Sequence, residues 1–221
     1  MTPARKTFRD QGDLNRAIRA LVKQDGRLSL VVGRIGMPAL RRREPGFEGL
    51  ARIIVAQQVS TAAANAIWTR VASGLGSFSV QTVAKATPAR LGRLGLTAAK
   101  ARALKSIAQE LNEGALDLDA LALCDADAAH ERLTQLRGVG PWTADVYLLF
   151  CLGHGDAWPA ADIAIQEGMR IGLGLRSRPT TREAVTLGDA WRPYRGAAAH
   201  LWWATVHASR REAAPRAIPN S

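Results

Sequence analysis

The sequence has few cysteines, and this excludes several kinds of protein. Cys124 and Cys151 are the only two among 221 residues, too few for a disulfide scaffold. They are also too few for an iron–sulfur cluster or a zinc site that takes four thiolates from one chain. The four histidines have no ligand spacing with either cysteine, so we expect no zinc.

Long apolar runs are also missing. The stretches YLLFCLG (147–153) and LWW (201–203) fall well below the ~18 residues of a membrane span. The first residues, MTPARKTFRDQGD, have no apolar core, so we expect no signal peptide. The sequence therefore predicts a cytoplasmic protein that does not associate with membranes.

Lysine is scarce although the chain is strongly basic. Thirty basic residues against nineteen acidic ones give a net charge of +11, and Lys105 is the last lysine of the chain. Basic residues cluster at 41–43, between Arg90 and Lys105, and at 210–211. This charge indicates a polyanionic partner, with nucleic acid as the favoured candidate, although composition alone fits solvated arginines equally well.

Helical signals cover almost the whole chain, and the alternation typical of strands is scarce. Apolar spacing and capping residues predict an all-α fold of about ten helices. The predicted helices cover 11–23, 45–60, 61–76, 88 to 92 or 95, 98–114, 125 or 127 to 136, 141–151, 162–172, 181–191 and 193–209.

The sequence gives a weak signal for domain boundaries. The segment VVGRIGMPALRRREPG separates the first predicted helix from the others and favours a two-lobed molecule. We expect residues 1–44 to form an N-terminal helix and basic connector that pack on the body. Residues 45–209 should form that body, and residues 210–221 a frayed tail.

The segment LTQLRGVGPWTAD (133–145) is the most informative part of the sequence. It predicts a helix, a tight hairpin at 137–140 and a second helix from Pro141. Two glycines allow close approach of the backbone to a large partner, and Val139 can plug the space between the helices. The amides of Gly138, Gly140 and the following turn form an anion site suited to a DNA phosphate. A bare GxG fits an ordinary helix–helix turn, but the full spacing in a basic helical protein favours DNA.

This segment resembles the helix-hairpin-helix motif of the HhH-GPD superfamily of DNA base-excision glycosylases. Three more segments match in the right order, and together the four cover roughly 45–205. GLTAAKARALKSIA (95–108) and AWRPYRGAAAHLWWAT (190–205) resemble the AlkA-type branch, the DNA-3-methyladenine glycosylases II. The resemblance implies a compact helical glycosylase without an N-terminal β domain.

The resemblance also implies site residues. In DAWPAADIAI, Asp162 matches the catalytic Asp, whose carboxylate stabilises a cationic sugar and orients or deprotonates the attacking water. By position alone, a simple helix N-cap is the better interpretation of Asp162. The hairpin residues that would contact the DNA backbone are Gly138, Val139, Gly140, Trp142 and Thr143.

The base pocket is expected to be aromatic, because alkylated purines carry positive charge and stack well on electron-rich rings. Trp202 matches the family's pocket residue, and Trp142, Tyr147 and Trp158 should lie near it. We assign the other tryptophans to the core.

A residue must fill the gap left by a flipped base. The resemblance places it at Gln57 or Gln58, with Gln58 preferred, although an exposed helix-end glutamine is nearly as good an interpretation. It also implies a monovalent cation, Na⁺ or K⁺, held by the carbonyls of Thr134, Leu136 and Val139.

The chemistry is expected to be hydrolysis alone. Relatives that also cleave the backbone use a Lys just after the hairpin, and Trp142 stands at that position here. No Lys follows residue 105, and four cysteines are not available for an iron–sulfur cluster.

The sequence thus predicts a monomeric, monofunctional glycosylase that removes 3-methyladenine and related alkylpurines from double-stranded DNA in the bacterial nucleoid. Two alternatives remain open. The hairpin could serve a non-catalytic DNA-binding protein, which would need neither Asp162 nor the aromatic residues. The same fold could also act on uracil or deaminated purines, which would need hydrogen-bond readout.

Overall fold

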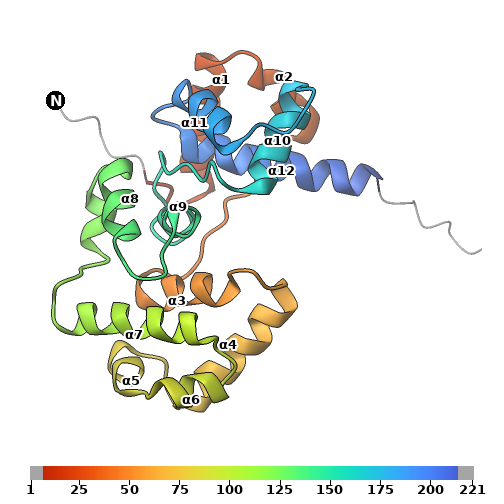
Figure 1. Ribbon diagram of the computed structural model, residues 1–221. Helices are drawn as coiled ribbons and strands as arrows, with labels where there is room; N and C mark the ends of the chain where they lie inside the picture. Colours follow the sequence, from red (N-terminus) through yellow and green to blue (C-terminus); the bar gives the residue numbers. More distant parts are fainter. Residues whose placement is uncertain (1–6, 214–221) are drawn as a thin grey trace, which may run out of the picture. The chain divides into compact units, whose positions relative to one another are not determined.

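The computed structural model describes residues 7–213, and within them the chain is helical (Figure 1). These residues form twelve α-helices and one 3₁₀ helix, with no β-strand, so the all-α prediction is confirmed. Among them, no helix has both the length and the apolar character needed to cross a membrane.

The described residues divide into two compact units. Unit 1 comprises residues 42–157 and unit 2 comprises residues 7–41 together with 158–213. The helices of unit 1 are α3 (Gly46–Ala56), α4 (Thr61–Leu75), α5 (Val80–Lys85), α6 (Pro88–Arg93), α7 (Ala98–Asn112), α8 (Ala126–Thr134) and α9 (Pro141–Phe150), with the 3₁₀ helix at Ala120–Leu123. Those of unit 2 are α1 (Gln11–Gln24), α2 (Leu28–Ile35), α10 (Ile163–Leu173), α11 (Thr181–Asp189) and α12 (Arg195–Ala213).

In unit 1, side-chain caps decide where most helices begin. Ser60, Ser79, Thr87, Thr97 and Asp125 each accept a hydrogen bond from a backbone N–H of the first turn. Such a cap replaces a hydrogen bond to water that the free helix end needs. The apolar faces of α3, α7 and α9 form the core, and α8 packs on α9.

In unit 2, α10 and α12 make the most extensive contact, and α1 and α2 pack against α12. The close approach of α10 to α12 depends on Gly168 and Gly172. A Cβ at Gly168 would lie 2.2 Å from the carbonyl oxygen of Trp202, and one at Gly172 would lie 2.5 Å from the indole ring of the same residue. Any larger side chain would therefore push α10 and α12 apart.

The structure differs from the sequence prediction in two helices and in the division of the chain. Helix α2 was not predicted and overlaps the start of the segment VVGRIGMPALRRREPG, because its Gly and β-branched Val residues have low helix propensity. The short helix α5 has only Val83 buried, too little for a periodic signal. Residues 45–209, expected to form one body, are divided at Ala157, and residues 7–41 pack with the C-terminal helices. Helix α12 extends to Ala213, and residues 214–221 of the expected tail lie outside the described residues.

His200 is buried on α12 as a neutral imidazole. Its Nδ1 lies 2.8 Å from the carbonyl oxygen of Gly196, and its Nε2 lies 3.5 Å from the backbone N–H of Arg41. This arrangement fits a ring that donates at Nδ1 and accepts at Nε2. Burial lowers the pKa of His200 from 6.5 to about 4.

We therefore predict a loss of stability in acid that depends on His200. Between pH 6.5 and about 4 the unfolded chain binds a proton that the folded chain does not, so stability falls as the pH falls through this window. Urea unfolding at pH 7 and pH 4.5 should show that this residue accounts for a loss of about 2–3 kcal/mol. The free energy of unfolding of His200→Gln should fall by about 2–3 kcal/mol less than that of the wild type between the same two pH values. Equal losses in both proteins would contradict the assignment.

Candidate functional site

The hairpin between α8 and α9 has the geometry that its sequence predicts. Val139 is 4 % exposed, and its N–H donates to the carbonyl oxygen of Leu136 at 3.1 Å. Gly140 is the N-cap of α9 and Pro141 its first residue, with no side chain capping this helix start. The positive end of the α9 dipole at this start attracts anions.

The two hairpin glycines have different roles. Gly138 has a φ of +79°, and a Cβ there would lie 2.5 Å from Cβ of Ala103 on α7. Gly140 has a φ of −87°, and a Cβ there would meet nothing within 4 Å. The fold itself therefore requires glycine at 138, whereas at 140 the protein leaves open space.

The loop after α3 is hydrogen-bonded to the hairpin through Gln57. Its side-chain amide donates to the carbonyl oxygen of Gly138 at 3.1 Å and to the Thr143 hydroxyl at 2.9 Å. Gln58, the next residue, is exposed and has a φ of +56°, the one positive φ of a non-glycine residue among residues 7–213. Of the two predicted wedge residues, Gln57 is thus tied to the hairpin and Gln58 points outward from a strained backbone.

Two lysines of the basic cluster serve as helix C-caps. The ammonium of Lys100 donates to the carbonyl oxygens of Val55 and Gln57, both at 2.8 Å. Lys105 does the same for Ala84 and Ala86, at 2.8 and 2.6 Å. A cation at a helix C-terminus satisfies free carbonyls and opposes the negative end of the helix dipole. Burial lowers the pKa of Lys100.

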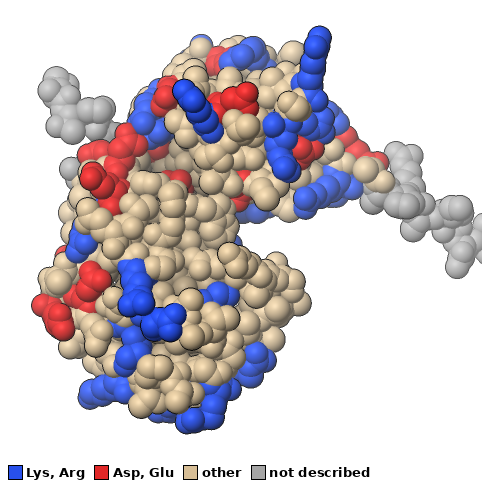
Figure 2. All heavy atoms as spheres, viewed as in Figure 1, with Lys and Arg blue, Asp and Glu red and all other residues tan. Residues whose placement is uncertain are grey.

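The other basic residues of this segment are exposed, although Arg90 also donates to the carbonyl oxygen of Gly74 at 2.8 Å. Residues 80–112 hold six basic side chains and one acidic one, Glu110. On the face shown in Figure 2, Lys and Arg side chains spread over the region of α5, α6 and α7 with few acidic ones among them. The exposed members are Lys85, Arg90, Arg93 and Arg102.

Asp162 lies in unit 2 as the N-cap of α10. The carboxylate oxygen Oδ1 accepts from the backbone N–H groups of Ala164 at 2.8 Å and Ile165 at 3.1 Å. It also accepts from the indole N–H of Trp203 at 3.1 Å. Asp162 is 9 % exposed, so these donors replace most of the water around a charge that also faces the positive end of the α10 dipole.

The loop that leads to Asp162 is held by its own hydrogen bonds. The indole N–H of Trp158 donates to the carbonyl oxygen of Ala184 at 3.0 Å. The side-chain amide of Gln166 donates to the carbonyl oxygen of Ala160 at 2.8 Å. Gln166 is 7 % exposed. The carboxylate therefore stands at the end of an anchored segment and not on a free loop.

Three tryptophans form a cluster in unit 2. The ring of Trp191 lies 5.5 Å from that of Trp158 and 5.3 Å from that of Trp202. The indole N–H of Trp191 donates to the Asp25 carboxylate at 3.0 Å, and Asp25 also pairs with Arg27 at 2.7 Å. The hydrogen bond and charge of Arg27, together with the Trp191 bond, lower the pKa of Asp25 to about 2. The C-terminal end of α1 thus supports the aromatic cluster.

The predicted aromatic residues are divided between the units. Trp142 and Tyr147 are on α9 in unit 1, and Trp158 and Trp202 are in unit 2 with Asp162. Tyr147 and Trp202 are fully buried, and the Trp202 N–H has no hydrogen-bond partner. Burial also raises the pKa of Tyr147. Trp142 is the member with a partly exposed side chain.

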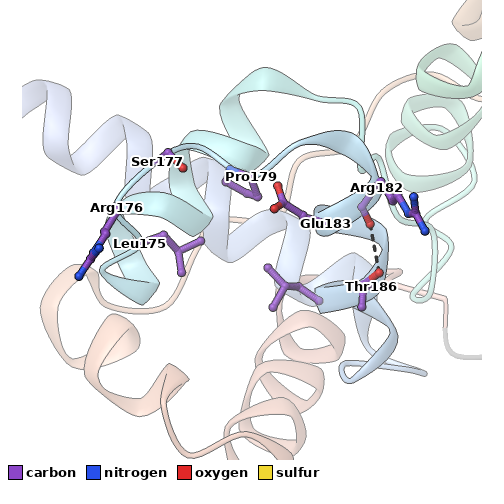
Figure 3. Close-up of a pocket in the computed structure, with 8 residues that line it drawn as sticks. Leu175, Arg176, Ser177, Pro179, Arg182, Glu183 and Thr186 are labelled. Atoms are coloured by element: carbon purple, nitrogen blue, oxygen red, sulfur yellow. Dashed lines mark hydrogen bonds between the residues drawn. The ribbon is translucent and has the colours of Figure 1, made fainter.

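Unit 2 also has an open cavity of about 520 Å³ at the C-terminal end of α10 and along α11 (Figure 3). It includes none of the predicted site residues. Its lining combines apolar side chains with two arginines, and Glu183 there is part of the capping box at the start of α11. The lining residues are Leu175, Arg176, Ser177, Pro179, Arg182, Glu183, Thr186 and Leu187.

Comparison with known proteins gives the family. The model of the HhH-GPD superfamily base excision DNA repair proteins matches residues 51–193, which include the Gln57–Gln58 loop, the hairpin and Asp162. The chain belongs to this superfamily. The HhH-GPD assignment made from the four sequence segments is therefore confirmed.

Two curated HhH-GPD relatives show the range of lengths. The chain is 34% identical to the "Probable bifunctional transcriptional activator/DNA repair enzyme AlkA" of Mycobacterium tuberculosis over 86% of its own length. It spans only 40% of that relative. It is 33% identical to DNA-3-methyladenine glycosylase 1 of Schizosaccharomyces pombe, covering 76% of this chain and 75% of that one.

Two solved structures share the HhH-GPD fold. A DNA-3-methyladenine glycosidase from Bacillus halodurans is 27% identical with a TM-score of 0.81, covering 89% of this chain and 91% of that chain. A 3-methyladenine DNA glycosylase from Schizosaccharomyces pombe in complex with abasic DNA is 30% identical with a TM-score of 0.73. The match covers 85% of this chain and 95% of that one.

Sequence reasoning missed three contacts of the candidate site. Trp203 was assigned to the core but donates to Asp162. Lys100 was grouped with the basic cluster, and Gln57 was not recognised as a link to the hairpin. These contacts join positions 41 to 86 residues apart, for which one sequence carries no signal. The glycines inside α10 were the one local hint of close packing.

We predict that Gly138→Ala and Gly140→Ala act differently. Gly138→Ala should destabilise the fold by roughly 1–3 kcal/mol, because alanine is strained at positive φ and its Cβ meets Ala103. Gly140→Ala should change stability by less than about 0.5 kcal/mol. If the hairpin approaches a phosphate, the added methyl group should still weaken binding to duplex DNA. Thermal unfolding and fluorescence anisotropy measure the two effects.

DNA binding by the Gly140→Ala variant decides whether the hairpin contacts DNA. A stable variant that binds duplex DNA as tightly as the wild type would remove the hairpin from the DNA interface.

Proposed function

We propose that the chain is a monofunctional DNA glycosylase that hydrolyses the N-glycosidic bond of 3-methyladenine and related alkylpurines in base excision repair. It would act as a monomer on double-stranded DNA. The observation that carries the proposal is the buried carboxylate of Asp162, which three N–H donors hold at the start of α10. A protein that only binds DNA needs no such group. The names of the relatives support the choice of alkylated bases.

In the proposed reaction, the bond between the base and C1′ of the sugar breaks and positive charge develops on the sugar ring. The Asp162 carboxylate stabilises this charge and orients or deprotonates the water that attacks C1′. Alkylated purines already carry positive charge, so they leave readily and need little acid catalysis. Preorganisation of Asp162 by its hydrogen bonds is therefore the main contribution of the protein to this step.

The flipped base would be held by aromatic rings. A cationic purine gains from stacking on tryptophan, and we propose Trp142, Tyr147, Trp158 and Trp202 for this pocket. Trp142 is the one that a base can reach without displacing a buried side chain, since its side chain is partly exposed. Buried Trp202 would have to be uncovered for stacking.

Binding would combine backbone contacts with a wedge. The uncapped start of α9 suits a phosphate, contacted through Gly138, Val139, Gly140, Trp142 and Thr143. Gln58 is our choice for the residue that fills the gap in the duplex, because it is exposed while Gln57 is occupied by two hydrogen bonds. The exposed basic residues of α5–α7 would add salt-dependent affinity.

We propose that the protein uses no zinc and no iron–sulfur cluster. A Na⁺ or K⁺ ion would bind at the hairpin through the carbonyls of Thr134, Leu136 and Val139. Carbonyl oxygens are suitable ligands for such ions. The Leu136 carbonyl accepts one hydrogen bond, from Val139, and has a second lone pair for a cation.

The first test of this function is Asp162→Asn. Asparagine caps a helix as well as aspartate, so folding should be nearly unchanged. The negative charge is lost, so release of 3-methyladenine from methylated duplex DNA should slow by about 10²–10³-fold. Binding to duplex DNA should persist.

A matched control is available in the same unit. Asp10 caps α1 by accepting from the N–H of Asp13 at 2.8 Å, so Asp10→Asn makes the same change at another helix start. It should leave base release unchanged. A folded Asp162→Asn protein with the wild-type rate of release would refute the catalytic role.

The second test concerns strand cleavage. A lyase needs an amine that attacks the sugar. Lys100 is the lysine that contacts the Gln57 loop, and its ammonium group already donates to two backbone carbonyl oxygens. Borohydride added during turnover should therefore trap no covalent protein–DNA complex. A trapped complex that disappears in Lys100→Met would show that this lysine forms an imine and that the protein is not monofunctional.

A further inference from the structure

Trp203 on α12 makes a contact that the sequence did not reveal. Its indole N–H donates to Oδ1 of Asp162 at 3.1 Å, across two different helices of unit 2. Both side chains are buried, with 7 % of Trp203 and 9 % of Asp162 exposed. The other donors to this oxygen, from Ala164 and Ile165, belong to the backbone of α10 itself.

The chemistry of the indole N–H suits the positioning of a carboxylate. It donates one hydrogen bond and accepts none, so it cannot exchange a proton with Asp162 at neutral pH. A hydrogen bond to a charged oxygen is stronger than one between neutral groups, and a low dielectric strengthens it further. Backbone donors hold Oδ1 from the side of α10. Trp203 holds the same oxygen from α12, which restricts rotation of the carboxylate about its last bond.

The packing of α10 on α12 sets the length of this hydrogen bond. Gly168 lets the carbonyl of Trp202, the neighbour of Trp203, approach the α10 backbone. Gly172 accommodates the ring of Trp202 one turn later. Because both contacts are close, α12 has little freedom to slide, and the Trp203 N–H stays opposite the start of α10.

We infer that Trp203 is a positioning residue for base excision, which orients the Asp162 carboxylate toward the sugar through its indole N–H. This inference rests on the proposed function, because it needs Asp162 to act on the substrate. It assigns to Trp203 a role that goes beyond packing: loss of the N–H alone, with the ring kept, should slow excision.

The test is a double-mutant cycle of Trp203→Phe and Asp162→Asn. Four proteins, each in excess over methylated duplex DNA, are compared by the single-turnover rate of 3-methyladenine release. In the wild-type background Trp203→Phe should lower the rate about tenfold, the effect of one coupled hydrogen bond. In the Asp162→Asn background the same change should have an effect of less than about twofold, because there is no carboxylate to orient. Affinity for an abasic duplex should change little.

A structural role would give a different result. It predicts equal rate losses in both backgrounds, and that outcome would overturn the inference, as would an unchanged rate in the wild-type background. Trp68→Phe is the matched control, since Trp68 is a buried tryptophan of unit 1 that packs on Phe78. It should leave the rate unchanged.

A second variant separates the N–H from the shape of the ring. If Trp203→Phe lowers the thermal unfolding temperature, 3-benzothienylalanine at position 203 keeps the bicyclic ring and replaces N–H by sulfur. It should give the same rate loss, and a wild-type rate would refute the inference. A wild-type protein that releases no alkylated base would instead refute the proposed function before the cycle begins.

Discussion

The carboxylate of Asp162 is buried, and a buried charge is stable only when hydrogen-bond donors replace the water that it loses. Two of its donors come from the first turn of α10 and a third from α12. The local sequence supplies the first two wherever a helix starts at an aspartate. The third exists only because α10 and α12 pack closely at Gly168, so the electrostatics of the site depend on helix packing.

The aromatic cluster follows from the same packing. Gly172 leaves room for the ring of Trp202, and a Cβ at Gly188 would lie 2.3 Å from the indole nitrogen of Trp158. Trp191 joins these two rings and is held by Asp25 at the end of α1. The C-terminal end of α1 therefore supports the aromatic cluster, although more than a hundred residues separate Asp25 from Trp191 in the chain.

Unit 1 uses a comparable principle for its backbone. The loop after α3 and the hairpin before α9 both contain carbonyl groups that need side-chain partners, because a buried carbonyl without a hydrogen bond costs free energy. Gln57 and Lys100 satisfy these groups and join the two segments. Gln58 then remains exposed with an unusual backbone conformation, and for this reason we propose it, and not Gln57, as the wedge residue.

Much of the fold could be predicted, because helix starts depend on neighbouring residues. The helices from 61, 88 and 98 and the hairpin at 137–140 were all predicted from short patterns, and the structure shows Ser60, Thr87 and Thr97 as the caps of these helices. Helices α2 and α5 were missed because their residues have weak propensity or little apolar surface to bury. The division of the chain was also not apparent, since it depends on the association of residues 7–41 with the C-terminal helices.

The sequence by itself determined the helical class, the hairpin, the family and the position of Asp162 at a helix start. Each of these depends on residues within about fifteen positions of one another or on the order of such segments. Only the tertiary structure decided that Trp203 contacts Asp162, that Lys100 caps α3 and that Gln57 binds the hairpin. These contacts join distant helices, and they form because buried charges and carbonyls must find partners wherever packing brings donors near.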